Sequence, residues 1–434
     1  MWAPAFAAVF LLTILLMGCG QGTTPMTDTP PPVGSPTPTE TSPDRTATPT
    51  PREGPWTLAP IQLWLPESLS PYGQGEAADI LAEQLAAFSE ENPTLQVETT
   101  VKRAHGRGGL LDFMRTARDA APSVLPDLVV LDASDLETMV GTGLLHPLEP
   151  YVTPSVASDR YSFAVEVGAV GEELVGFVIG ADLELLAYRP ALFESPPISW
   201  TDVITPPVDF VFPAAGVDGR VNDATLVQYL GAGGKFTQMG TATLSREPLL
   251  SVLEFYSDCV RTGSVSPSVV LDVGVTDRAW ELLELEVADV GVVPASSFFP
   301  GGEERYRIGS PPSRYGRPIG MVSQAKVIAL VADGSDRQEV AMKLLNWLID
   351  PERNAEWSYA AGLVPGTREG LRDWPLTSAD RAALHRVMEA AVPRPSSEEL
   401  STVGPLMQDA VEAVLSGELS PREATNRAVE TTGE

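Results

Sequence analysis

The sequence predicts an α/β fold built on open, doubly wound sheets, in a chain long enough for two lobes. Apolar strands alternate with amphipathic helices after residue 56, a pattern that gives parallel sheets covered by helices. The chain has 434 residues, of which 43% are hydrophobic and 20% charged, an ordinary globular balance. The predicted strand 127–132 is wholly apolar between its two acidic end residues, as in a central strand buried on both faces.

The first part of the globular region alternates regularly between strands and helices. Residues 61–65 alternate apolar and polar side chains and predict a strand. Residues 77–91 carry apolar side chains at helical spacing and end at Asn92-Pro93, a helix stop signal. The same reasoning predicts, in order, strand 95–101, helix 109–120, strand 127–132 and helix 133–140.

From residue 161 the pattern becomes less regular, although strands and helices still follow one another. Two strands are expected at 173–179 and 183–188, with a break at Gly180-Ala181-Asp182. Later elements are expected as helix 200–204, strand 209–212, helices 223–231 and 247–262, strands 289–294 and 323–331, helix 336–348 and a helical tail from 377.

Charge and cysteine content exclude several classes of function. The net charge of −29 repels nucleic acid and anionic lipid headgroups, so neither is an expected partner. Cys259 lies in an apolar helical pattern and is expected in the core. With Cys19 as the other cysteine and three scattered histidines, neither a disulfide nor a metal site is expected.

The N-terminus has the features of an export signal. The apolar run 3–17 ends at Gly18-Cys19, and about fifteen apolar residues are too few to span a bilayer as a mature helix. Residues 1–19 resemble a bacterial lipoprotein signal, which implies lipidation of Cys19 and a membrane anchor. The segment departs from that pattern in two ways. It has no Lys or Arg before the apolar run, and Met17 is an unusual residue two positions before the cysteine. An uncleaved anchor or a different start codon remains the alternative.

Residues 20–55 are expected to form a disordered tether. They are rich in Thr, Pro, Ser and Gly and contain runs such as Pro30-Pro31-Pro32. Such a composition cannot bury a core. In an extended polyproline-like form it would reach up to roughly 100 Å. The globular region would then stand clear of the membrane.

Four stretches in a characteristic order carry a family resemblance. They are Leu85 to Glu98, Leu125 to Leu148, Ile319 to Leu348, and the turn Ala361-Gly362-Leu363-Val364-Pro365-Gly366-Thr367-Arg368. Over residues 59–370 the chain resembles the extracellular solute-binding proteins of ABC transporters (family 1), which include maltose- and oligosaccharide-binding lipoproteins.

The resemblance implies a periplasmic-binding-protein-like fold of type II, with two lobes that close on a ligand about a hinge. The expected lobes are 56–175 plus 315–350 and 176–314 plus 351–434. The implied protein is a monomer without a cofactor, at the cell surface or in the periplasm, that passes a solute to an ABC permease. Carbohydrate is the favoured solute, ahead of polyamines, phosphodiesters and peptides.

Sugars present apolar ring faces and a rim of hydroxyls, so a sugar site needs aromatic rings with carboxylates and amides. Candidate contacts are expected at strand ends and loops beside the cleft. They are Trp64, Glu67, Asp132, Asp182, Tyr188, Gly233, Phe298, Phe299, Tyr315, Trp357 and Tyr359.

Each candidate also has a purely structural interpretation. Aromatic rings on helices and strands are more often part of a core, and Trp64 in particular can pack between helices. Asp132 can cap the helix that follows it, and Asp182 can belong to a hinge turn. The glycines at 231–234 can end a helix and do not match a phosphate loop.

No catalytic motif is present in the sequence. Gly-X-Ser-X-Gly and His-Glu-X-X-His are absent, and no carboxylate pair stands out among 58 acidic residues. The sequence therefore favours a binding protein over an enzyme. An exported sensor or surface adaptor that no longer takes part in transport is the alternative function.

Overall fold

We describe the protein from a computed structural model, which covers residues 59–193, 195–205, 208–217, 220–238, 241–274, 276–299 and 301–432. The expected signal 1–19 with Cys19 and the tether 20–55 lie outside these residues. Among the described helices, none combines the length and apolar character that crossing a membrane requires.

The N-terminal elements alternate as the sequence predicts. They are β1 (Ile61–Pro66), α1 (Glu76–Glu91), β2 (Val97–Lys102), α2 (Leu110–Ala120), β3 (Leu128–Asp132), α3 (Leu136–Val140), α4 (Pro154–Asp159) and α5 (Ser162–Val167), with short 3-10 turns after β1, α2 and β3. Strand β1 lies between β2 and β3 and is parallel to both.

The middle of the chain contributes the long strand β6 (Phe177–Tyr188) and the elements around it. The short hairpin strands β4 (Ala169–Val170) and β5 (Glu173–Leu174) precede β6. The elements that follow it are α6 (Trp200–Ile204), β7 (Phe210–Val211), α7 (Asp223–Gly231), β8 (Thr237–Gln238), β9 (Thr241–Ala242), α8 (Arg246–Thr262), α9 (Pro267–Val270), α10 (Thr276–Glu284), β10 (Val290–Pro294), α11 (Ala295–Phe298) and β11 (Arg307–Gly309).

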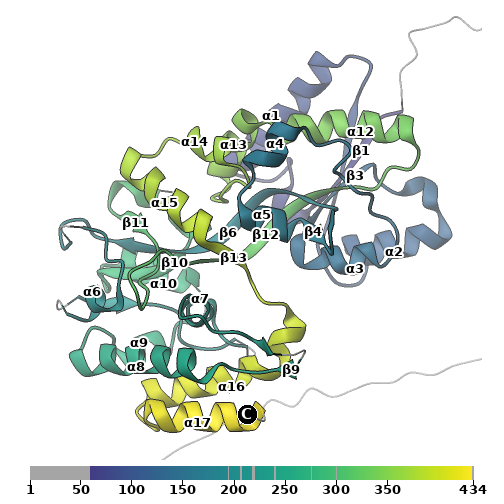
Figure 1. Cartoon of the computed structure of the whole chain (residues 1–434). Helices are drawn as coiled ribbons and strands as arrows, with labels where there is room; N and C mark the ends of the chain where they lie inside the picture. Colours follow the sequence, from purple (N-terminus) through teal and green to yellow (C-terminus); the bar gives the residue numbers. More distant parts are fainter. Residues whose placement is uncertain are drawn as a thin grey trace, which may run out of the picture. The chain divides into compact units, whose positions relative to one another are not determined.

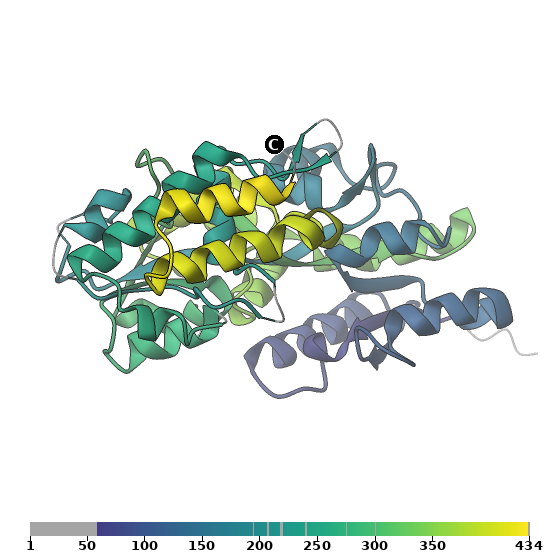
Figure 2. The same ribbon diagram turned by 90° about the horizontal axis from the view of Figure 1, so that it is seen from below.

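The C-terminal part begins with a second long strand, β12 (Gly320–Leu330). It continues through α12 (Ser335–Leu348), α13 (Pro351–Ala360), α14 (Arg368–Arg372), α15 (Ser378–Ala390), β13 (Ala391–Pro393), α16 (Ser397–Leu415) and α17 (Pro421–Thr432). Helices α16 and α17 lie side by side and pack on α8 (Figure 2).

Nine described strands join one sheet in the order β2-β1-β3-β12-β6-β10-β7, with β11 on β6 and β13 on β12. Strands β6 and β12 run antiparallel and connect its two halves (Figure 1). One end of β12 pairs with β3, whereas one end of β6 pairs with β10 and β11. The sheet is therefore mixed rather than purely parallel.

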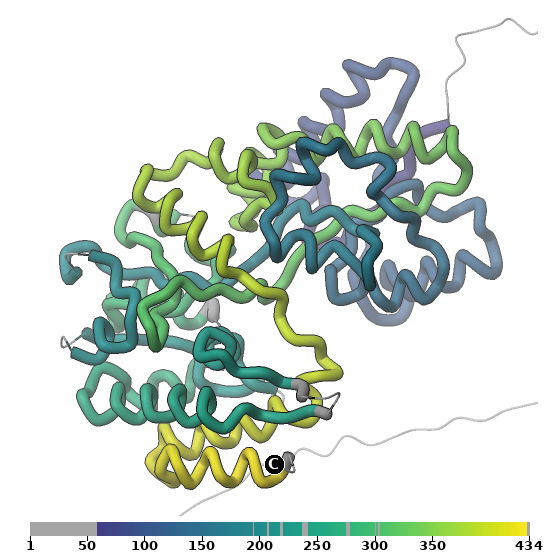
Figure 3. The backbone as a smooth tube through the Cα atoms, in the orientation of Figure 1, coloured from purple at the N-terminus to yellow at the C-terminus, as the bar shows by residue number. Residues whose placement is uncertain are grey.

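After β12 the chain returns to its first elements through α12 and α13, before its C-terminal helices (Figure 3). Helix α12 packs on α1, where Trp347 donates its indole N–H to the Gln84 carbonyl at 3.0 Å. Helix α13, expected in the second lobe, also packs on α1, and Gln84 donates to the Arg353 carbonyl at 2.9 Å. The exact division of residues between the lobes stays a prediction.

The prediction of two strands at 173–179 and 183–188 was wrong. Residues 177–188 form one continuous strand, β6, and only Glu173–Leu174 form a separate short strand. The segment 180–182, expected as a break, lies within β6 and pairs with β12. Its glycine and aspartate therefore have another role, which the site explains.

Candidate functional site

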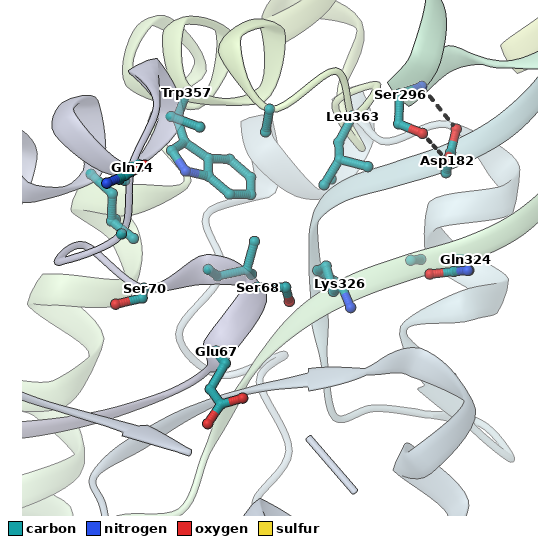
Figure 4. Close-up of a pocket in the computed structure, with 18 residues that line it drawn as sticks. Glu67, Ser68, Ser70, Gln74, Asp182, Ser296, Gln324, Lys326, Trp357 and Leu363 are labelled. Carbon is teal, nitrogen blue, oxygen red and sulfur yellow. Dashed lines mark hydrogen bonds between the residues drawn. The ribbon is translucent and has the colours of Figure 1, made fainter. Parts of the chain in front are cut away.

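A cavity of about 510 Å³ lies where β6 and β12 pass each other (Figure 4). Its walls come from the loop after β1, the first turns of α1, the middle of β6 and β12, α11, α13 and the turn after α13. The loop follows the carboxyl end of β1, the edge at which open α/β sheets bind ligands. A volume of this size suits a small ligand.

One side of the cavity is apolar and centres on Trp357 of α13. Trp357 as a whole is 5% exposed, and its indole lies beside Leu363, while Leu81 contributes from α1. Gly180 of β6 lets these side chains approach the strand, because a Cβ there would lie 2.9 Å from the Leu363 Cβ and 3.3 Å from the indole. The glycine that looked like a strand break thus makes room for the aromatic wall.

The opposite side is polar and holds Asp182 of β6. Ser296, at the start of α11, donates its N–H to one Asp182 oxygen at 3.2 Å and its hydroxyl to the other at 2.5 Å. Gly362 packs on Ser296, where a Cβ would lie 2.8 Å from the Ser296 Cα, and its φ is +67°. The turn after α13 therefore fixes the serine that orients Asp182.

Lys326 of β12 reaches the cavity and is held from behind by Asp132. The ammonium donates to Asp132 Oδ1, and His105 Nε2 lies 2.8 Å from Asp135 and 3.8 Å from Asp132. Burial is the main cause that raises the pKa of Asp135, opposed by the hydrogen bond with His105. Asp132 does not cap the following turn with its side chain.

The same cluster is the place where a cation could be held among the described residues. Ligand atoms of His105, Asp132 and Asp135 lie within 4.8 Å of one another. They are already engaged with each other and with the Lys326 ammonium, which supplies the positive charge that a metal would bring. We therefore describe the cluster as a charge network and assign no metal to it.

Three of the eleven candidates line this cavity: Glu67, Asp182 and Trp357. Asp132 contacts it indirectly through Lys326. Trp64 is 4% exposed and packs against Phe113, with Lys102 over both rings, on the side of the sheet covered by α2. It borders a different cavity, of about 580 Å³, near Arg337.

The aromatic candidates Phe298, Phe299 and Tyr359 lie outside the lining. Phe299 contacts Trp374 and Tyr359 at ring-centroid distances of 4.7 and 6.2 Å, while Phe298 contacts Trp280 at 5.7 Å. These rings form one aromatic cluster at the C-terminal end of α11.

Three further candidates also lie elsewhere. Tyr188 packs on Phe193 at the end of β6, and burial raises its pKa. Gly233 has φ +87° just after α7, and Tyr315 is 64% exposed beside Arg314. Ligand contact by these residues stays a prediction.

Most of the polar lining was not predicted from the sequence, namely Ser68, Ser70, Gln74, Ser296, Gln324 and Lys326. A signal for two of them was present. Gln324 and Lys326 interrupt the apolar run of β12, and polar side chains in such a strand need a partner or a ligand. The loop serines carried no comparable signal.

Comparisons with known proteins identify the family and the fold. The sequence model of the family described as bacterial extracellular solute-binding protein matches residues 83–382. The structure resembles the cyclic α-maltosyl-1,6-maltose binding protein of Arthrobacter globiformis, with a TM-score of 0.66 and 15% identity over 86% of this chain and 98% of that chain.

Two other solved structures are similar. The sugar-binding protein MalE of Xanthomonas citri gives a TM-score of 0.64 and 18% identity, over 86% of this chain and 96% of that chain. An ABC transporter solute-binding protein of Thermotoga lettingae bound with α-D-tagatose gives 0.60 and 19%, over 86% and 98%. At such identities the likeness shows the fold, and it confirms the expected two-lobed α/β architecture. The chain belongs to the bacterial extracellular solute-binding protein family.

Proposed function

We propose that this protein is a membrane-anchored receptor that captures a small carbohydrate between its two lobes and delivers it to an ABC permease. The observation that carries the proposal is the cavity, in which one indole faces a set of hydroxyl, amide and charged groups (Figure 4). The sugar ligands named for similar structures support the same class.

The lining matches the chemistry of a sugar. The apolar face of a pyranose ring suits the Trp357 indole. Carboxylates accept hydrogen bonds and an ammonium donates them, while serine hydroxyls and glutamine amides do both. The described lining offers all three kinds of partner to a rim of hydroxyls. Such a rim contains donors and acceptors together.

The position of the cavity supports capture by closure. Strands β6 and β12 connect the two halves of the sheet, and Asp182 and Lys326 lie on them. Relative motion of the halves would change the distance between the loop after β1 and Ser296, which line opposite parts of the cavity. Closure of this kind excludes water from a ligand. Lipid on Cys19 would keep the receptor near its permease.

The test is ligand binding by residues 20–434, screened by thermal melting against sugars, amino acids, polyamines and phosphoesters. A ligand at 100 times its dissociation constant adds about 2.7 kcal/mol to the stability of the folded state. We expect a sugar to raise the melting temperature and to be recovered chemically unchanged. Trp357→Leu should weaken its binding at least about tenfold, measured by calorimetry, because the stacking surface is lost.

Trp347→Leu is the matched control, because Trp347 packs on Phe88 and Arg353 and does not line the cavity. This variant should lose stability while its affinity for the sugar stays within about twofold of the parent. A sugar that binds both variants equally well would place the site elsewhere. Failure of every sugar to bind, or conversion of the sugar to a product, would contradict the proposal.

A further inference from the structure

The cavity lining carries more negative than positive charges. Glu67, Asp182 and Lys326 are its charged residues among those described. The Lys326 ammonium is already bonded to Asp132, a carboxylate behind the lining. The lining therefore holds two carboxylates and one ammonium, and the ammonium is neutralised by a third carboxylate. The excess charge facing a ligand is negative.

Glu67 is the carboxylate that remains available. It is exposed at the edge of the cavity, and its carboxylate makes no hydrogen bond or ion pair with the described residues. Asp182, in contrast, accepts hydrogen bonds from Ser296. Glu67 lies at the other end of the lining from Trp357, and its carboxylate points away from the indole (Figure 4). Rotation of this exposed side chain would bring a free anionic group to the far edge of a ligand stacked on the indole.

Resting on the proposed function, we infer that the preferred ligand is an amino sugar, a short carbohydrate with an unmodified primary amine. One ring stacks on Trp357, and the ammonium, with its three N–H donors, binds the carboxylate of Glu67. The single indole in the described lining favours one stacked ring rather than a long chain. The net charge of −29 would also raise the local concentration of a cationic ligand.

The experiment compares matched sugars that differ only at the amino position. Glucosamine, N-acetylglucosamine and glucose, with the corresponding galactose series and the β-1,4-linked dimers, are titrated by calorimetry at pH 7 in low salt. We expect the free amine to bind at least about tenfold more tightly than its acetylated and hydroxyl counterparts. Because the charges are near solvent, the preference should shrink in 0.5 M NaCl.

Glu67→Gln should reduce the preference for the amine about tenfold and leave the affinity for neutral sugars within about twofold. Glu76→Gln is the matched control, since Glu76 is an exposed residue in the first turn of α1 that does not line the cavity. It should leave the preference unchanged. Equal melting temperatures of the two variants would show that the fold is intact.

The outcomes separate this inference from the proposed function. Binding of a neutral sugar as tightly as its amine, or a preference for the amine that survives Glu67→Gln or high salt, would overturn the inference and leave the sugar receptor standing. Spermidine is included as an amine without a ring, and tighter binding of spermidine than of any amino sugar would overturn both. Absence of binding by every sugar would also overturn both.

Discussion

Single residues in β6 and β12 determine the shape and the polarity of the cavity. Gly180 admits the indole of Trp357, and Asp182, two positions on, offers a carboxylate to the same space. Lys326 reaches the cavity from the neighbouring strand and pairs with Gly180 in the register. Three neighbouring positions in this mostly buried pair of strands thus supply room, an acceptor and a donor. Polar groups in such a place are retained only when they have partners.

The lone cysteine of the globular region gives a prediction at this scale. Cys259 is fully buried in α8, and burial raises the pKa of its thiol to about 12. The thiolate is the reactive form, so little of it exists at pH 8. In a Cys19→Ser variant we expect iodoacetamide to label the folded protein about 1,000-fold more slowly than the protein unfolded in guanidinium, measured by mass spectrometry.

The pH dependence of the labelling rate tests whether burial is what protects the Cys259 thiol. If burial alone protects Cys259, its rate in the folded protein should follow the rate at which the fold opens and stay low even at pH 9. Labelling at pH 8 that approaches the rate of the unfolded chain would contradict the buried position of the thiol.

Sequence reasoning at this scale succeeded where a residue's neighbours in the chain determine its surroundings. Cys259 was expected in the core because its helix has an apolar pattern, and it lies there. Trp64 was expected at the ligand, but side chains alternate along a strand, and Trp64 points to the α2 side while Leu63 and Leu65 point to α1. Which face carries the cavity between β6 and β12 depends on how β12 pairs, which local sequence does not show, and ligand contact by Trp64 stays a prediction.

At the scale of elements, the helix α16 begins with a capping box. Ser396 accepts a hydrogen bond from the Glu399 N–H at 3.2 Å, and the Glu399 carboxylate accepts one from the Ser396 N–H at 2.9 Å. These bonds satisfy donors that a helix start otherwise leaves free. Helix α16 packs on α8 and α17, so a stable first turn of α16 supports the packing of these three helices.

Ser396→Ala should cost about 1 kcal/mol at this helix start, because the cap acceptor is lost. The amides of the first turn of α16 should then exchange with deuterium roughly fivefold faster, measured by hydrogen-exchange mass spectrometry. Ser397→Ala is the control, since Ser397 is exposed and makes no side-chain hydrogen bond within the described residues. Equal exchange in the two variants would show that the cap does not stabilise this helix.

Elements were predicted well where their periodicity was long and regular. Helices α1, α8 and α12 and strand β10 lie within a residue or two of the expected ranges. Strand β6 was divided wrongly because a glycine and an aspartate inside a strand look like a turn when only neighbours in sequence are considered. Its partner β12 lies about 140 positions later, and long-range pairing of that kind overrides local turn signals.

At the scale of the whole globular region, β6 and β12 connect the two halves and also line the cavity. The pairing of these two strands is irregular, with register shifts between Val322 and Gln324 and between Lys326 and Val327. Irregular pairing weakens a ladder locally and permits bending. The cavity thus lies beside this irregular pairing. A change in the angle between the two halves of the sheet at this position would move the groups that contact a bound ligand.

We therefore expect the two lobes to close when a ligand binds. Spin labels on Glu137→Cys in α3 and Glu254→Cys in α8, both exposed, would report on the two halves in a Cys19→Ser background, since Cys259 is buried. Pulsed electron–electron double resonance should show a shift in the distribution of distances between the two spin labels when the sugar that stabilises the protein is added. The pair Glu137→Cys and Glu83→Cys, both on elements of the first half, should show none. A ligand that binds without shifting the first distribution would mean that capture occurs without hinge motion, and the cavity would then have to be complete before the ligand arrives.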